Sequence, residues 1–149
     1  MDTAPAAPSL VVAFGADHAG FRLKAVLIEW LQAQGHTATD FGTDGPASVD
    51  YPDYAHPVCQ AVLNGAARFG VLICGSGLGM SYAANRHRGI RCAMVSETTS
   101  TYLSRFHNDA NVLALGERMI GVDMAIDILR VFLATSYEGG RHDRRIAKI

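Results

Sequence analysis

Short apolar runs alternate with segments of helical periodicity along the chain, and this alternation constrains the fold more than any other feature. The apolar runs predict strands at residues 10–14, 37–41, 69–74, 90–95 and 112–115. The periodic segments predict helices at residues 21–34, 52–66, 80–85, 97–107 and 122–134. Strands separated by helices are joined by right-handed crossovers and pair in parallel. The sequence therefore predicts an α/β fold, a Rossmann-like three-layer sandwich with a five-stranded, mostly parallel sheet.

Two of the predicted helices carry boundary signals. In the helix at residues 21–34, Leu23, Leu27 and Leu31 recur every four residues and share one face, and Gly35 supplies a stop. For the helix at residues 97–107 we expect Ser96 to be the N-cap, because its hydroxyl can accept a hydrogen bond from the first turn.

Length and composition bound the domain organisation and the partners. A chain of 149 residues with 49% apolar residues can build one domain around a sizeable core. We expect residues 1–9 to form a disordered N-terminal extension without a signal-peptide pattern, and residues 10–149 to form a single domain with a C-terminal helical tail at about 137–149. The net charge of −1 argues against a nucleic-acid or membrane-surface partner. No apolar run approaches the roughly 20 residues that span a bilayer, and we expect a cytoplasmic protein.

The strongest functional signal is the segment from Val71 to Gly79. An apolar strand runs into Cys74 and then into a loop with glycine at alternate positions, Gly75, Gly77 and Gly79. If a helix begins after this loop, its backbone N–H groups and the positive end of its dipole converge beside the Cys74 sulfur. Such a position favours a thiolate and a developing oxyanion.

The other two cysteines, Cys59 and Cys92, lie within apolar patterns, and we predict that both belong to the core. The three cysteines lack paired spacing. The sequence therefore predicts neither a disulfide framework nor a zinc site.

Polar clusters also interrupt the apolar pattern near the ends of other elements. Asp17 and His18 follow the first strand, His107 and Asn108 lie near the end of the fourth helix, and Arg118 follows the fifth strand. Ligands in open α/β sheets bind at the carboxyl ends of strands. In the tail, Arg141 and Arg145 are four residues apart and could form a fork for a phosphate dianion. Together these residues suggest a small phosphorylated ligand.

The order and spacing of these motifs resemble the type B ribose-5-phosphate isomerases, in the family that also contains galactose-6-phosphate isomerase subunits. The resemblance covers roughly residues 11–146. The segments that carry it are Gly15-x-Asp17-His18-x-Gly20-Phe21, Asp50-Tyr51-Pro52, Cys74-Gly75-Ser76-Gly77-x-Gly79, Ala83-Ala84-Asn85, Gly89-Ile90-Arg91, Ser104-Arg105-x-His107-Asn108-Asp109-x-Asn111-Val112-Leu113 and Tyr137-Glu138-Gly139-Gly140-Arg141-His142.

The resemblance implies an aldose–ketose isomerase that acts through an enediolate, with ribose 5-phosphate as the default substrate. Cys74 would move the proton between C1 and C2, His107 would assist ring opening, and Asp17 would bind sugar hydroxyls. The groups implied to hold the enediolate oxygens are the N–H groups of Gly75, Gly77 and Gly79, the Ser76 hydroxyl and Asn108. The positions implied to bind phosphate are His18, Arg118, Arg141 and Arg145, and Tyr51 is implied to contact the substrate.

The family resemblance further implies a homodimer in which each active site combines segments of two subunits, and it leaves open whether two dimers form a tetramer. The chemistry needs no metal and no redox cofactor, because a thiolate near neutral pKa and preorganised donors meet its demands.

Two departures from the family pattern bear on mechanism and specificity. Some relatives use a glutamate six residues after the cysteine position as base, and here that residue is Met80, whose thioether cannot take a proton. Ser76 stands where many relatives carry threonine and keeps the hydroxyl. Residues 1–9 and 43–49 are covered poorly by the pattern, so the preferred sugar could instead be allose 6-phosphate, galactose 6-phosphate or a tetrose phosphate.

Other function classes remain as alternatives. Gly75, Gly77 and Glu97 imitate a dinucleotide-binding fingerprint, but Met80 occupies the third glycine position. A non-catalytic sugar-phosphate sensor would keep the fold while losing Cys74 or His107, and both are present. A thiol redox enzyme would need a resolving cysteine near Cys74 in the sequence.

Overall fold

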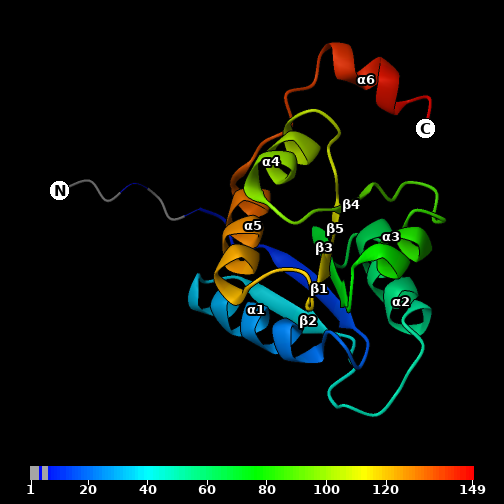
Figure 1. Cartoon of the computed structure of the whole chain (residues 1–149). Coiled ribbons are helices and arrows are strands. Elements are labelled where there is room, and N and C mark those ends of the chain that lie inside the picture. The colour runs from blue at the N-terminus through cyan, green and yellow to red at the C-terminus, as the bar shows by residue number, and fades with distance from the viewer. Residues whose placement is uncertain (1–3, 5–6) are drawn as a thin grey trace.

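The computed structural model describes residue 4 and residues 7–149, which form a parallel sheet between two layers of helices (Figure 1). The strands are β1 (Val11–Ala16), β2 (Thr37–Asp40), β3 (Phe69–Cys74), β4 (Cys92–Met94) and β5 (Val112–Gly116). The helices are α1 (Phe21–Ala33), α2 (Pro52–Leu63), α3 (Leu78–Ala84), α4 (Thr98–Phe106), α5 (Val122–Ala134) and α6 (Arg141–Ile146). The expected disordered extension at residues 1–9 falls partly on residues 1–3 and 5–6, which lie outside the described residues.

The sheet order is β2-β1-β3-β5-β4, and all four strand pairs are parallel. The predicted five-stranded α/β sandwich with a C-terminal helix is therefore confirmed. None of the helices among the described residues combines the length and apolar character that crossing a bilayer requires.

Alternate residues of the central strands fill two separate cores. In β3, Val71 and Ile73 pack on the face covered by α1 and α5, whereas Leu72 packs on the face covered by α2 and α3 (Figure 1). All three side chains are fully buried. A strand buried on both faces reads as a continuous apolar run, as residues 69–74 do. Each such side chain contributes about 1.5–3 kcal/mol through burial.

The direction in which successive strands are added to the sheet reverses after β2. The connection through α1 leads from β1 to β2 on one side, whereas the connection through α2 leads from β2 back past β1 to β3. The two connecting helices therefore cover opposite faces, and a crevice opens between the carboxyl ends of β1 and β3. This topological switch point is the usual ligand site of an open α/β sheet.

The strand predicted at residues 90–95 is present, but it is shorter and more exposed than the apolar run indicates. The strand β4 covers Cys92–Met94 only, and Met94 is 41% exposed. Because β4 lies at the edge of the sheet, it pairs with β5 alone. Ile90 and Val95, which flank the strand, supply the buried apolar side chains of this run.

The expectation that Ser96 caps α4 is also wrong, because Glu97 is the N-cap. Its backbone is extended, and its carboxylate accepts hydrogen bonds from the backbone N–H groups of Thr99 and Ser100. The hydrogen bonds from Ser100 hold the pKa of the Glu97 carboxyl below its ordinary value. A carboxylate at this position also interacts favourably with the helix dipole.

A buried arginine fastens the end of α4 to the segment that leads to the tail. Arg105 is 3% exposed, and its guanidinium donates to the Asp109 carboxylate at 2.8 Å and to the carbonyl oxygens of Ala110 at 2.6 Å and Thr135 at 3.3 Å. Burial lowers the pKa of Arg105, and the adjacent Asp109 carboxylate opposes that shift. These bonds fix the conformation of the turn that carries His107.

We predict that Arg105→Ala lowers the free energy of unfolding by about 3 kcal/mol, because it leaves two carbonyls without their donor and the Asp109 carboxylate paired with Arg91 alone. The matched control is Arg130→Ala on the surface of α5, where Arg130 pairs with Asp127 in solvent. That change costs less than about 1 kcal/mol. Urea denaturation measures both, and equal losses would contradict the role of the buried arginine.

Candidate active site

A cavity of about 360 Å³ opens at the carboxyl ends of β1, β3 and β5. Its walls come from the segments after these strands, from the start of α2 and from the start of α3. The lining residues are Asp17, His18, Ala19, Tyr51, Cys74, Gly75, Ser76, Gly79, Arg118 and Met119. The structure thus gathers eight of the thirteen expected site residues here, and Gly77 lies beside them in the same loop.

Cys74 ends β3 and receives a hydrogen bond from the loop that follows it. The N–H group of Gly77 donates to Cys74 Sγ at 3.1 Å. Gly77 reaches this position with φ = 81°, a left-handed conformation that glycine adopts without a Cβ clash. The sulfur therefore faces a fixed donor that stabilises a thiolate, as the glycine spacing indicates.

The two remaining cysteines differ from Cys74. Cys59 is fully buried, as predicted, and burial raises the pKa of its thiol to about 11. Cys92, on the edge strand, is only partly buried, so its assignment to the core holds in part. Burial raises the pKa of the Cys92 thiol far above its usual range. Both thiols are therefore poor nucleophiles near neutral pH.

Ser76 and Tyr51 line the cavity beside Cys74. Ser76 Oγ accepts a hydrogen bond from the N–H group of Leu78 at 3.3 Å, which leaves its hydroxyl proton available to donate. The ring of Tyr51 lies directly against Gly79, since a Cβ at residue 79 would come within 2.5 Å of it. The third loop glycine therefore permits close approach of the aromatic ring.

The segment after β1 supplies Asp17 and His18. Asp17 is 6% exposed, and its Oδ1 accepts a hydrogen bond from the N–H group of Ala19 at 2.9 Å. His18 Nδ1 accepts a hydrogen bond from the N–H group of Val49 at 3.2 Å. Both side chains are thus oriented by backbone donors.

Arg118 extends over the loop from the end of β5. Its backbone N–H group donates to the carbonyl of Gly75 at 3.1 Å, and its guanidinium Nη1 would lie 3.2 Å from a Cβ at residue 75. The neighbouring Glu117 is occupied elsewhere, because its carboxylate accepts a hydrogen bond from Leu23 N–H in the first turn of α1.

The structure does not bring His107, Asn108, Arg141 and Arg145 into this cavity. His107 is the C-cap of α4, at the end where the chain returns to the start of β5. Arg141 and Arg145 both lie in α6, which stands off beside α4 (Figure 1). Cys74 pairs with Gly116 at the carboxyl end of β5, whereas His107 and Asn108 precede the amino end of β5. The tail lies with them, because Glu138 N–H donates to the Phe106 carbonyl.

His107 belongs to a cluster that the sequence interpretation missed. Its ring stacks on the His142 ring with centroids 4.6 Å apart, and His142 Nε2 lies 2.9 Å from the Glu138 carboxylate. The ligating atoms of the three residues lie within 4.8 Å of one another, so their spacing could admit a metal ion. The sequence feature that could have indicated this cluster is the four-residue spacing between Glu138 and His142.

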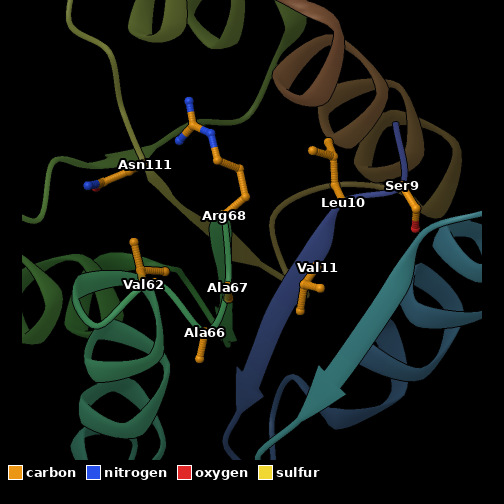
Figure 2. Close-up of a pocket in the computed structure, with 9 residues that line it drawn as sticks. Ser9, Leu10, Val11, Val62, Ala66, Ala67, Arg68 and Asn111 are labelled. Carbon is orange, nitrogen blue, oxygen red and sulfur yellow. The ribbon is translucent and has the colours of Figure 1, made fainter. Parts of the chain in front are cut away.

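Larger cavities lie elsewhere on the molecule. One of about 440 Å³ opens near the starts of β1 and β3, and Figure 2 shows its lining side chains. Among its described lining residues Arg68 is the one charged side chain, beside apolar walls such as Val62 and Ala67. This cavity lacks the combination of thiol, carboxylate and hydroxyl that the cavity at Cys74 holds.

Comparison with known proteins decides the family. The chain matches the family described as Ribose/Galactose Isomerase over residues 12–149. The chain belongs to this family. It is 46% identical over 138 residues to ribose-5-phosphate isomerase B of Escherichia coli (strain K12), with 93% of each chain covered. It is 38% identical over 141 residues to D-erythrulose-4-phosphate isomerase of Pectobacterium atrosepticum, covering 94% of this chain and 93% of that one.

A solved structure gives the same result. Ribose-5-phosphate isomerase B from Clostridium thermocellum superposes with a TM-score of 0.92 at 45% identity, covering 93% of this chain and 94% of that one. The resemblance noted in the motifs is confirmed, and the chain is an enzyme of the sugar phosphate isomerase class. The family match disfavours the dinucleotide-binding and thiol redox interpretations.

We predict that iodoacetamide at mildly alkaline pH modifies Cys74 before Cys59 and Cys92. The raised pKa values keep the latter two thiols protonated, whereas Cys74 has an N–H donor and a cavity in front of it. Mass spectrometry of the peptides over a time course measures the order. Labelling of Cys92 as fast as Cys74 would contradict the prediction.

Proposed function

We propose that this enzyme interconverts ribose 5-phosphate and ribulose 5-phosphate through an enediolate, with Cys74 as the base. The observation that carries the proposal is the hydrogen bond from Gly77 N–H to Cys74 Sγ at 3.1 Å, in a cavity that Asp17 and Ser76 also line. Relatives with 45–46% identity that are named ribose-5-phosphate isomerase B support the choice of sugar.

Proton transfer alone accounts for the reaction. In the open-chain aldose, the Cys74 thiolate takes the proton from C2, and the electron pair moves to give an enediolate across C1 and C2. The thiol then returns the proton to C1, while the C2 hydroxyl proton moves to the oxygen on C1. The thiolate is regenerated, and the carbon skeleton undergoes no net oxidation.

The enediolate oxygens need donors that are already oriented. The Ser76 hydroxyl has its proton available, and Gly75 and Gly79, whose backbone N–H groups can donate, line the same cavity. Donors fixed by the backbone stabilise the developing charge without the reorganisation that water would need. Met80 follows this loop as a fully buried apolar residue, which leaves Cys74 as the base of the segment.

The remaining groups in the cavity suit the two ends of a sugar phosphate. One oxygen of Asp17 is fixed by Ala19 N–H, and the other can accept hydrogen bonds from sugar hydroxyls. His18 and Arg118 lie in the same cavity and can donate to the phosphate. Tyr51 offers a ring against which the carbon chain can pack.

We further infer that a second copy of the chain completes the site. Roughly 13 Å of strand separate the two ends of β5, at about 3.3 Å per residue. His107, Asn108, Arg141 and Arg145 lie at the far end and cannot reach the Cys74 cavity of their own subunit. In a homodimer, His107 of the partner subunit would assist ring opening and Asn108 of the partner subunit would bind the enediolate. The partner's Arg141 and Arg145 would hold the phosphate.

Exposed apolar side chains near the cavity support such a dimer. Tyr82 in α3 and Met119 beside the cavity are each 67% exposed, and Leu78 at the start of α3 is 42% exposed. Large apolar side chains that lie together on a surface mark association surfaces.

All three cysteines are free thiols, which fits a reaction in the reducing cytoplasm.

A tetrose phosphate is the second candidate substrate. The D-erythrulose-4-phosphate isomerase of Pectobacterium atrosepticum shares 38% identity with this chain over nearly its whole length. One carbon changes the depth of the pocket and leaves the proton transfer unchanged. The higher identity to the relatives named for ribose 5-phosphate favours the pentose.

We predict that the enzyme converts ribose 5-phosphate to ribulose 5-phosphate in D₂O with deuterium incorporated at the exchanging carbon. Because Cys74 is the proposed base, Cys74→Ala lowers kcat by about a hundredfold or more while the protein stays folded. NMR follows both product formation and deuterium incorporation. Erythrose 4-phosphate and allose 6-phosphate, tested in parallel, rank the alternative sugars.

The matched control is Cys92→Ala, which removes a thiol outside the cavity and keeps activity near that of the wild type. Full activity in Cys74→Ala would overturn the proposed base. Turnover of the tetrose phosphate alone would overturn the assignment of ribose 5-phosphate and keep the isomerase chemistry.

A further inference from the structure

His18 accepts a hydrogen bond from a loop that has no part in the proposed proton transfer. Residues 41–50 lie between β2 and α2, and they contact His18, which lines the Cys74 cavity. From this loop, the backbone N–H group of Val49 donates to His18 Nδ1 at 3.2 Å. The segment is also the one that the family motifs cover poorly.

Accepting this hydrogen bond defines the protonation of the ring. Nδ1 can accept only through its lone pair, so it carries no proton, and the neutral imidazole then holds its proton on Nε2. An imidazolium has a proton on both nitrogens and cannot accept from Val49. In this arrangement His18 presents a neutral Nε2–H donor.

Both limbs of the loop are fastened to the rest of the molecule. At the start of the loop, Thr43 N–H donates to the Ala16 carbonyl at 2.7 Å, and Ala16 N–H donates to the Gly42 carbonyl at 2.8 Å. The buried Lys24 pairs with Asp40 at 2.5 Å just before these residues.

On the returning limb, Tyr51 packs against Gly79 two residues after Val49. The N–H group of Val49 is therefore held between an anchored loop start and a packed ring. Because both ends of the loop are held, the hydrogen bond from Val49 to His18 can form without substrate.

We propose that Val49 is a positioning residue whose backbone N–H fixes His18 as a neutral Nε2–H donor to the anionic end of the substrate. The proposal rests on the proposed function, in which His18 and Arg118 bind the phosphate. Arg118 then supplies the positive charge, and His18 supplies a directed hydrogen bond. The side chain of Val49 is not required for this role.

The direct test is NMR of the free enzyme with ¹⁵N-labelled histidine at neutral pH, which distinguishes the two neutral tautomers and the imidazolium. His18→Gln identifies the His18 signals by their loss. The expected result is the Nε2–H tautomer. An Nδ1–H tautomer or an imidazolium at His18 would overturn the proposal.

Val49→Pro removes the N–H donor, and Val49→Ala keeps it and serves as the matched control. We expect Val49→Pro to shift the His18 tautomer and raise KM about tenfold with little change in kcat, and Val49→Ala to match the wild type in both. An unchanged tautomer in folded Val49→Pro, or the same changes in Val49→Ala, would overturn the role of the N–H group.

If Val49→Pro does not fold, the spectrum of the wild type still decides the tautomer. That spectrum needs no turnover, so it separates this proposal from the proposed function. Failure of the D₂O assay would overturn the isomerase assignment, whereas a wrong tautomer in an active enzyme would overturn only the positioning role.

Discussion

The parallel pairing of all five strands is the constraint on which the rest of the structure depends. All strands run in the same direction, so each helix must carry the chain back across a face of the sheet to start the next strand. Segments that follow strands therefore gather at the carboxyl ends of the strands, and segments that follow the returning helices gather at their amino ends. Asp17, Cys74 and Arg118 belong to the first group, and His107 belongs to the second.

This constraint explains which of the expected site residues lie together and which do not. At the carboxyl ends of the strands, a thiol with an N–H donor, a carboxylate, a hydroxyl and a guanidinium surround one cavity. The helical tail with Arg141 and Arg145 lies beside α4, away from that cavity (Figure 1). In the proposed homodimer, the helical tail of one subunit would complete the cavity of the other, and association would then be part of catalysis.

The sequence predicts the features that depend on local pattern. The apolar run at residues 69–74 identifies the central strand, and the glycine spacing after Cys74 indicates the N–H donor found at Gly77. It predicts less well what depends on neighbours distant in the chain. The exposure of Met94 follows from the edge position of β4, which strand order determines and periodicity does not.

The sequence pattern also does not predict side-chain roles that depend on tertiary contacts. Ser96 is the better N-cap by propensity, yet the chain caps α4 with Glu97 because its longer carboxylate reaches both first-turn N–H groups. The burial of Lys24 against Asp40 and of Arg105 against Asp109 requires a fold to place the partner. The sequence spacing of Val49 and His18 does not predict the hydrogen bond between them.

Subunit complementation tests the divided site most directly. Cys74→Ala and His107→Ala chains, carrying different affinity tags, are co-expressed, and the mixed dimers are purified through both tags. Each variant alone is expected to lose about a hundredfold or more in activity toward ribose 5-phosphate. A mixed dimer holds one intact site, and the account predicts about half of the wild-type activity. Mixed dimers as inactive as either parent would contradict a site shared between subunits.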